Sequence, residues 1–338
     1  MNAMERLAAA VAGTPADRIP VFCNLLDQGA RELGMPLEQY YAKGENVAEG
    51  QLRMQQRYGH DNVWSLFYVG KEVELLGCRK ILFAEDGPPN VADFVIRDYD
   101  DIVRLRIPDD ISAEPAFAET AKCLAILRRE VGGKVPICAY LTASMTMPAL
   151  LMGMDRWMEL VVAGPTDLRD LLLTKCSEFF RKQIAAYRAA GADVLLYSNP
   201  FGSTYFVGMK RFRELSLPWM ERDLVDGVDG IVYYCGMAPF SNIVGDVIER
   251  LRLGAYYFAP DDDIASAKAI VAGRGLSCGV INDIRMLSWT EQEVGAEVAR
   301  IIGAGKEGGK FLFGTGVMPF GIPEANIRAL LETAFRLG

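Results

Sequence analysis

A cysteine ends one of the most β-prone runs of this sequence, IVYYCG at residues 231–236. Three roles are open to Cys235: a buried thiol that packs like a small apolar side chain, a metal ligand, or a reactive thiolate. The chain has one histidine, His60, so a two-histidine metal site within one chain is excluded. A Cys–His or Ser–His–Asp mechanism is also hard to build, because His60 comes at the start of a predicted strand and Cys235 at the end of one. The chemistry of Cys235 therefore depends on the polar side chains that share its end of the fold.

Asp27 and Arg31 form a second pair with chemical potential, because they follow a predicted strand and stand four residues apart. On a helix they could simply pair on one face, which is worth about 0.3 kcal/mol. At the mouth of a barrel, Asp27 would instead act as an acid, a base or a hydrogen-bond acceptor. We expect the second role.

Eight short runs of mostly apolar residues alternate with longer helical patterns along the chain. The predicted strands cover about 19–24, 62–68, 135–140, 193–198, 230–235, 254–258, 276–281 and 310–314. The predicted helices include a first one ending at Gly13 and others near 114–131, 165–190, 209–225, 241–252, 264–273, 290–304 and 323–336. Strands that are apolar throughout are typical of a parallel sheet buried on both faces. Eight β–α units close naturally into a (β/α)8 TIM barrel of the α/β class.

One insertion interrupts this repeat at about 71–110, after the second predicted strand. Its sequence DGPPN has the residues of a turn and predicts a β-hairpin. No segment reads as a linker, so we expect one barrel domain over residues 1–338.

Composition narrows the classes of function. The net charge of −8 disfavours a nucleic-acid role, which calls for a basic patch. No apolar run reaches the length of a membrane span. The seven scattered cysteines contain no CxxC pair, which is typical of a reduced cytoplasm.

In such a barrel, the reacting groups lie at the C-terminal ends of the strands. The residues expected there are Asn24, Asp27, Arg31, Tyr68, Tyr140, Ser198, Asn199, Tyr205, Tyr233, Cys235, Asn282, Asp283 and Thr315. Most are polar and uncharged. The tyrosines either pack or hydrogen-bond a substrate, and both readings stay open at this point.

Five stretches carry a resemblance to a known family: RIPV (18–21), EVELLGCRKILFAEDGPP (72–89), AGAD (190–193), YYCG (233–236) and GVMPFGIPEANI (316–327). In this order and spacing, they resemble the uroporphyrinogen decarboxylase superfamily, including its methylcobamide:thiol methyltransferase branch. The resemblance spans nearly the whole chain. It implies a TIM barrel whose funnel takes a tetrapyrrole or a corrinoid-linked substrate.

The methyltransferase branch binds zinc through a His-x-Cys-Gly motif and a second, later cysteine. Here the motif reads Tyr233-Tyr234-Cys235-Gly236, and Gly316 stands at the second cysteine position. Cys235 is the one metal ligand that this resemblance retains, and one thiolate does not make a zinc site. We therefore expect no zinc-activated thiol. A corrinoid, carried by a partner protein or bound transiently, remains the implied cofactor.

The decarboxylase branch grips substrate carboxylates with a loop that reads Arg-Gln-Ala-Gly-Arg. Here the loop starts with Asp27 and keeps Arg31, so one positive charge is reversed. Tyr68 stands in place of the aspartate that binds pyrrole N–H groups, and Thr315 in place of the histidine of a Gly-His-Gly motif. A polycarboxylate substrate would be repelled by Asp27.

We therefore expect methyl transfer between a corrinoid and a small molecule or tetrahydrofolate, with Asp27, Tyr233 and Cys235 as catalytic residues. The other strand-end residues would position the substrate. Two alternatives stay open: a decarboxylase that holds an altered substrate through Arg31, and a barrel that binds a ligand without catalysis.

Overall fold

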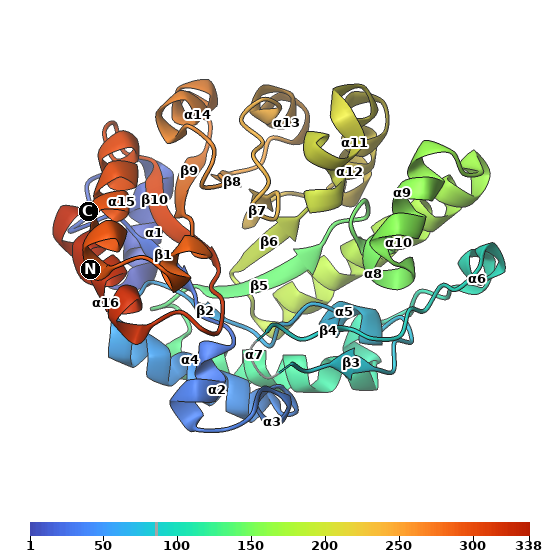
Figure 1. Ribbon diagram of the computed structural model, residues 1–338, viewed down its shortest axis with the longest axis horizontal. Helices are drawn as coiled ribbons and strands as arrows, with labels where there is room; N and C mark the ends of the chain where they lie inside the picture. Colours follow the sequence, from blue (N-terminus) through green and yellow to red (C-terminus); the bar gives the residue numbers. More distant parts are fainter. Residues whose placement is uncertain (85–86) are drawn as a thin grey trace.

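The computed structural model describes residues 1–84 and 87–338, and its centre is an eight-stranded parallel sheet (Figure 1). The strands are β1 (Val21–Asn24), β2 (Val63–Trp64), β5 (Ile137–Thr142), β6 (Val194–Ser198), β7 (Ile231–Tyr234), β8 (Ala255–Tyr257), β9 (Leu276–Ile281) and β10 (Phe311–Val317). They pair in the order β1-β10-β9-β8-β7-β6-β5-β2. All eight predicted strands are confirmed, and the sheet curls into a nearly closed barrel.

Side chains and one main-chain hydrogen bond, rather than a strand ladder, close the seam between β1 and β2. The Val21 N–H donates to Asp61 Oδ2 and the Asp61 N–H to the Val21 carbonyl, both at 2.8 Å. The Cys23 N–H donates to Asn62 Oδ1 at 2.8 Å. Arg18 forms an ion pair with Asp61, so this buried carboxylate is neutralised as well as hydrogen-bonded. The short β2 strand is therefore held in place at both edges.

Helices cover the outside of the barrel (Figure 1). They are α1 (Ala3–Ala12), α2 (Gln28–Leu33), α3 (Leu37–Tyr41), α4 (Gly44–Tyr58), α5 (Lys71–Glu74), α6 (Tyr99–Arg104), α7 (Ala118–Val131), α8 (Met147–Met152), α9 (Met154–Val162), α10 (Thr166–Ala190), α11 (Thr204–Arg211), α12 (Leu217–Asp223), α13 (Val244–Leu251), α14 (Ile264–Val271), α15 (Glu291–Gly305) and α16 (Glu324–Leu337). The ends follow local rules: Asn2 and Glu5 form a capping box on α1, and Gly13 and Gly191 end α1 and α10 in the left-handed conformation. None of the described helices is long and apolar enough to cross a membrane.

The helix predicted over 209–225 is not one regular helix. Gly208 has a φ of 73° inside α11, and a π-helical turn at Phe212–Ser216 separates α11 from α12. A glycine tolerates this backbone, and a π turn inserts one residue into the hydrogen-bond ladder. The hydrophobic pattern alone did not reveal either break.

The predicted insertion contains a two-stranded antiparallel hairpin, β3 (Ile81–Leu82) and β4 (Asn90–Val91). Asp86, the first residue of the predicted DGPPN turn, lies outside the described residues. Glu72 of α5 anchors the insertion to the barrel, because its carboxylate accepts from the Thr142 N–H at 3.1 Å and from Gln183 Nε2 at 2.8 Å. Burial raises the pKa of Glu72 to about 7, although these hydrogen bonds act to lower it.

Side chains alternate across the barrel wall, as in any strand. Trp64, Cys138, Leu196, Tyr234, Tyr257, Cys278 and Leu312 belong to one apolar cluster inside the barrel. Ile137, Leu195, Tyr197, Tyr233 and Tyr256 belong to the larger cluster between the sheet and the helices. This alternation decides which strand-end residues can reach the barrel mouth.

Candidate functional site

Three buried side chains form a polar floor across the barrel interior: Asn24, Trp64 and Tyr257. Asn24 Oδ1 accepts from Trp64 Nε1 at 3.1 Å, and Asn24 Nδ2 donates to the Thr315 carbonyl at 2.7 Å. The Tyr257 hydroxyl donates to the same carbonyl at 2.6 Å. A buried network with its polar atoms paired is rigid. The floor thus fixes the lower limit of any site at the mouth.

Aromatic rings and two hydroxyls line the wall above the floor. The Tyr140 and Ser198 hydroxyls hydrogen-bond each other from neighbouring strands β5 and β6. The Tyr234 ring lies edge-on between Tyr140 and Tyr257, with centroids 6.1 and 5.7 Å apart. Phe67 packs on the Tyr140 ring at 4.2 Å. This wall can enclose an apolar group while offering hydroxyls to a heteroatom.

Asp283 brings a carboxyl group to the mouth, directly after β9. Its side chain is buried, with 2% exposed, and Oδ2 has no hydrogen-bond partner among the described residues. Burial raises the pKa of Asp283 to about 7, although backbone N–H groups of residues 283 and 284 partly oppose this. A buried polar oxygen without a partner is costly and marks a candidate for function.

The space around Asp283 depends on Gly316. A Cβ at position 316 would lie 2.8 Å from Asp283 Oδ2 and 2.7 Å from the Met237 sulfur, closer than real Cβ atoms come. Glycine is therefore required where the carboxyl group and Met237 meet. By the resemblance, this is the position of the second zinc-binding cysteine.

Asp27 and Arg31 do not pair, so the helix-face ion pair that we considered is wrong. Asp27 accepts from the Tyr41 hydroxyl at 2.6 Å, and burial raises its pKa to about 6. The exposed Arg31 guanidinium donates to the carbonyls of Phe320 and Ile322 and lies over the Phe320 ring. Arg31 therefore holds the C-terminal loop through both of its terminal nitrogens.

Tyr68 belongs to the same side of the mouth as Asp27. Its ring packs edge-on against Tyr41 at 5.1 Å, and its hydroxyl hydrogen-bonds Glu74. Glu74 also accepts from Lys71 Nζ at 2.9 Å. Tyr68 thus joins the barrel to the insertion through a small charged cluster.

Tyr233 and Cys235 lie behind the strand, not in the barrel mouth where we expected them. Tyr233 is fully buried against Tyr197 and Phe240, and its hydroxyl lies 3.5 Å from Cys235 Sγ. The Cys235 thiol also faces the Asn199 carbonyl at 3.7 Å. Since Tyr234 points inward, the alternation of the strand turns its two neighbours outward. Burial raises the pKa of Cys235 to about 12, so this thiol stays protonated at neutral pH.

Four other predicted residues also have local roles. Asn199 is fully buried, with Oδ1 3.4 Å from the Thr146 hydroxyl. Asn282 Oδ1 accepts from the Arg285 N–H and so caps its own turn. Thr315 Oγ1 accepts from the Asn24 N–H at 2.9 Å. Tyr205 is 76% exposed on α11 and packs on Phe206, outside the barrel interior.

From the predicted set, the structure therefore pairs Tyr140 with Ser198 in the wall and Asn24 with Thr315 in the floor. It adds Trp64 and Tyr257, which the sequence prediction did not select, and it places Tyr234 in the aromatic wall and Asp283 beside Gly316 and Met237. Period-two alternation from the apolar Val232 would have pointed Tyr234 inward. Asp283 was recognised as a strand-end residue, but nothing in the sequence showed its buried, unpartnered oxygen.

The donor set does not fit zinc. Among residues 1–84 and 87–338, no three side chains of His, Cys, Asp or Glu converge to hold a metal ion. Tyr233 and Cys235 face away from the mouth, and Gly316 has no side chain. His60 is fully buried, and burial lowers its pKa to about 4, which suits a neutral core histidine.

A family model described as uroporphyrinogen decarboxylase (URO-D) matches residues 2–337. The methylcobamide:CoM methyltransferase MtbA of Methanosarcina mazei is 22% identical over 342 residues, covering 98% of this chain and 96% of the relative. A uroporphyrinogen decarboxylase of Geobacter sulfurreducens is 25% identical over 260 residues, with 74% of each chain covered. A solved methyltransferase structure from Methanosarcina mazei superposes with a TM-score of 0.85 at 20% identity, covering 99% of this chain and 98% of the other.

Proposed function

The chain belongs to the uroporphyrinogen decarboxylase family, and on that premise we propose that it moves a methyl group between a small substrate and a corrinoid. Methylcobamide:CoM methyltransferases match over nearly the whole chain, but so does a uroporphyrinogen decarboxylase of Geobacter metallireducens, so the side chains of the site carry the choice of branch. The corrinoid would be carried by a partner protein or bound transiently, and it would supply the methyl-transfer chemistry of cobalt. The other reactant is a small molecule, or tetrahydrofolate, whose heteroatom gains or loses the methyl group.

The observation that carries the proposal is the Asp283 carboxyl group beside Gly316. When the methyl group leaves a heteroatom, that atom keeps the bonding electron pair, and protonated Asp283 supplies a proton to it. In the reverse direction, ionised Asp283 accepts the proton that the heteroatom loses as it takes up the methyl group. A carboxyl group with a pKa near 7 suits both directions near neutral pH.

The remaining side chains hold the substrate. The Tyr140 and Ser198 hydroxyls offer hydrogen bonds to it, and Tyr234 covers its apolar part. The floor of Asn24, Trp64 and Tyr257 stops it from sinking into the barrel. Tyr233 and Cys235 have a packing role in this proposal.

Decarboxylation of a polycarboxylate is less well supported. Arg31 donates hydrogen bonds to two carbonyls of the C-terminal loop, and Lys71 is paired with Glu74. Asp27 adds negative charge on the same side of the mouth. A substrate with several carboxylates would meet no free cation among these residues.

The test is a spectroscopic methyl-transfer assay. Free cob(I)alamin is mixed with methylated amines, methoxy compounds, methyl thioethers or methyltetrahydrofolate, and methylcobalamin with thiols or tetrahydrofolate. We expect turnover with one class and a loss of at least about 100-fold in Asp283→Asn, the range for a general acid–base group. Cys235→Ala is the matched control and should stay within about threefold of wild type.

Equal rates in Asp283→Asn and wild type would refute the assigned role of Asp283. Turnover with none of these methyl donors or acceptors, together with tight binding of one of them, would favour the non-catalytic barrel. Release of CO2 from a porphyrinogen substrate would instead support the decarboxylase alternative.

A further inference from the structure

The barrel contains a cavity of about 210 Å³ beneath the polar floor, at the end opposite the candidate site. Apolar side chains from the strands and α1 supply most of its lining, among them Leu7, Phe22, Leu196, Val232, Ala255 and Leu312. The inner end is formed by Asn24, Trp64 and Tyr257, so the floor of the mouth is also the roof of this cavity. We propose that this cavity is a second ligand site, which takes a small neutral aromatic molecule.

Small residues leave this half of the barrel unfilled. Layers of bulky side chains normally pack the interior of a (β/α)8 barrel. Here Cys138, Cys278, Ala255 and Gly254 line the space. A Cβ built on Gly254 would meet no atom within 4 Å. The void follows from these residue sizes, since larger side chains at the same positions would occupy it.

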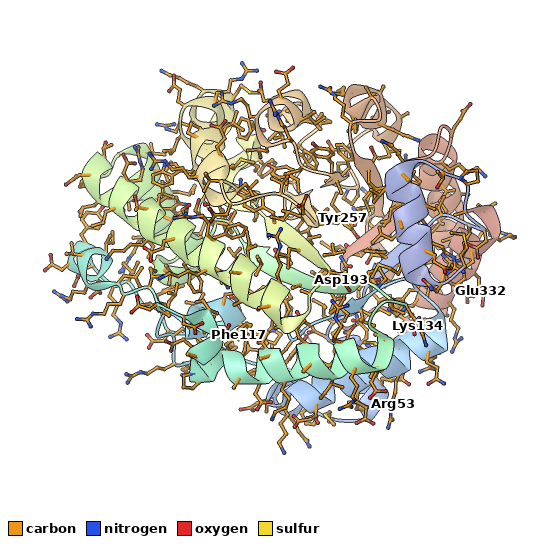
Figure 2. All side chains as sticks on the ribbon, turned by 180° about the vertical axis from the view of Figure 1, so that it is seen from behind. Arg53, Phe117, Lys134, Asp193, Tyr257 and Glu332 are labelled. Carbon is orange, nitrogen blue, oxygen red and sulfur yellow. The ribbon has the colours of Figure 1, made fainter. Side chains whose placement is uncertain are left out.

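The cavity is reachable from solvent. Val232 and Ala255 pack against the interior cluster, yet both are only partly buried. Leu7 and Val11, one turn apart on α1, lie at the rim, and Val11 is 51% exposed. Figure 2 shows α1 at one side of this end of the barrel, with the labelled Asp193 and Tyr257 beside it in that view. A small molecule can therefore enter next to α1.

The chemistry of the lining selects the class of ligand. Among the described residues that line the cavity, Asp193 has the one charged side chain. Its carboxylate is engaged at the rim by Arg128 at 2.7 Å and by the Ile137 N–H at 3.0 Å. With no cation in the lining, an acid or a phosphate would be desolvated without a partner.

The size of the cavity narrows the class further. An apolar cavity of about 150 Å³ holds benzene, so about 210 Å³ suits a single ring with a small substituent. The Trp64 and Tyr257 side chains at the inner end offer aromatic contacts to such a ring. This site does not depend on the proposed methyl transfer.

The first test is binding of trifluoromethylbenzene to the purified protein, measured by ¹⁹F NMR titration. We expect saturable one-to-one binding that toluene displaces. Ala255→Leu places a larger side chain in the cavity and should weaken binding at least tenfold. Val162→Leu is the matched control, because Val162 is 58% exposed on α9, and it should bind as wild type does.

Circular dichroism checks that Ala255→Leu is folded. A second measurement needs no variant: crystals of the wild-type protein under xenon should show a xenon atom in this cavity. The proposal is overturned if wild type shows no saturable binding, if folded Ala255→Leu binds with unchanged affinity, or if xenon does not enter the cavity.

Discussion

Replacing Asp283 by asparagine should stabilise the protein, and more so as the pH rises. The folded pKa of about 7 lies above the ordinary value of 3.8, because burial penalises the ionised form. Below pH 3.8 the carboxyl group is protonated in both states and the penalty is absent. As the pH rises toward 7, the unfolded state loses its proton and the folded state keeps it, so the folded state becomes progressively less favoured.

The size of the effect follows from the two pKa values. Each pKa unit corresponds to about 1.4 kcal/mol, so the ionisation of Asp283 lowers the free energy of unfolding by about 2 kcal/mol at pH 5 and about 4 kcal/mol at pH 8.5. Asp283→Asn removes this penalty at a nearly constant side-chain volume. The gain in unfolding free energy should therefore grow by roughly 2–3 kcal/mol between these two pH values.

Urea denaturation followed by circular dichroism, at pH 5 and pH 8.5, measures this gain. Other buried acids, such as Glu72 and Asp27, are present in both proteins, so they cancel in the difference. Asp226→Asn is the control, since its side chain is exposed, and should change the stability by less than about 0.5 kcal/mol at either pH. A gain that does not depend on pH, or a loss that grows toward pH 8.5, would contradict the placement of Asp283.

Three further predictions concern the same region. Gly316→Ala should lower the methyl-transfer rate at least about tenfold with an unchanged fold, because the new Cβ displaces the Asp283 carboxyl group. Gly245→Ala is the control, since a Cβ there meets no atom within 4 Å, and equal rates in Gly316→Ala and wild type would contradict the geometry. Cys235 should react with a thiol reagent such as DTNB only at the rate of local or global unfolding, because its thiol is buried and protonated. Rapid labelling of Cys235 in the folded protein, detected by peptide mass spectrometry, would show that the thiol faces the mouth. Arg31→Ala should cost about 1 kcal/mol in urea denaturation and increase hydrogen exchange in residues 318–323, since the loop loses its two carbonyl contacts; unchanged exchange there would refute the anchoring role.

The sequence predicted the fold well because its signals are local and repeated. Eight apolar runs, each followed by a helical pattern, are compatible with few architectures, and all eight became strands of one parallel sheet. Gly13 and Gly191 ended their helices as predicted, since a left-handed residue is a property of the chain itself. The π turn after α11 was missed because the hydrophobic pattern of residues 209–225 does not mark it.

The candidate site was predicted only in part, since a position at a strand end does not fix the direction of its side chain. Among the predicted residues, Tyr140 hydrogen-bonds Ser198, and Asn24 hydrogen-bonds Thr315. Tyr233 and Cys235 were placed at the mouth because they come at the end of a predicted strand, but they face the helices. Successive side chains of a strand point to opposite faces, so a shift of one residue moves a side chain to the other side of the barrel wall.

By itself, the sequence determined the order of strands and helices, the hairpin insertion and the lack of histidine for metal or nucleophilic chemistry. Only the tertiary structure decided that Asp283 lies beside Gly316 with an oxygen that has no partner among the described residues. It also decided that Asn24, Trp64 and Tyr257 divide the barrel into a mouth and a lower cavity. The physical reason is that the burial of a side chain and the pairing of its polar atoms depend on neighbours from distant segments of the chain. Residues 24, 64, 257 and 315 meet because the sheet closes, and no local pattern records that closure.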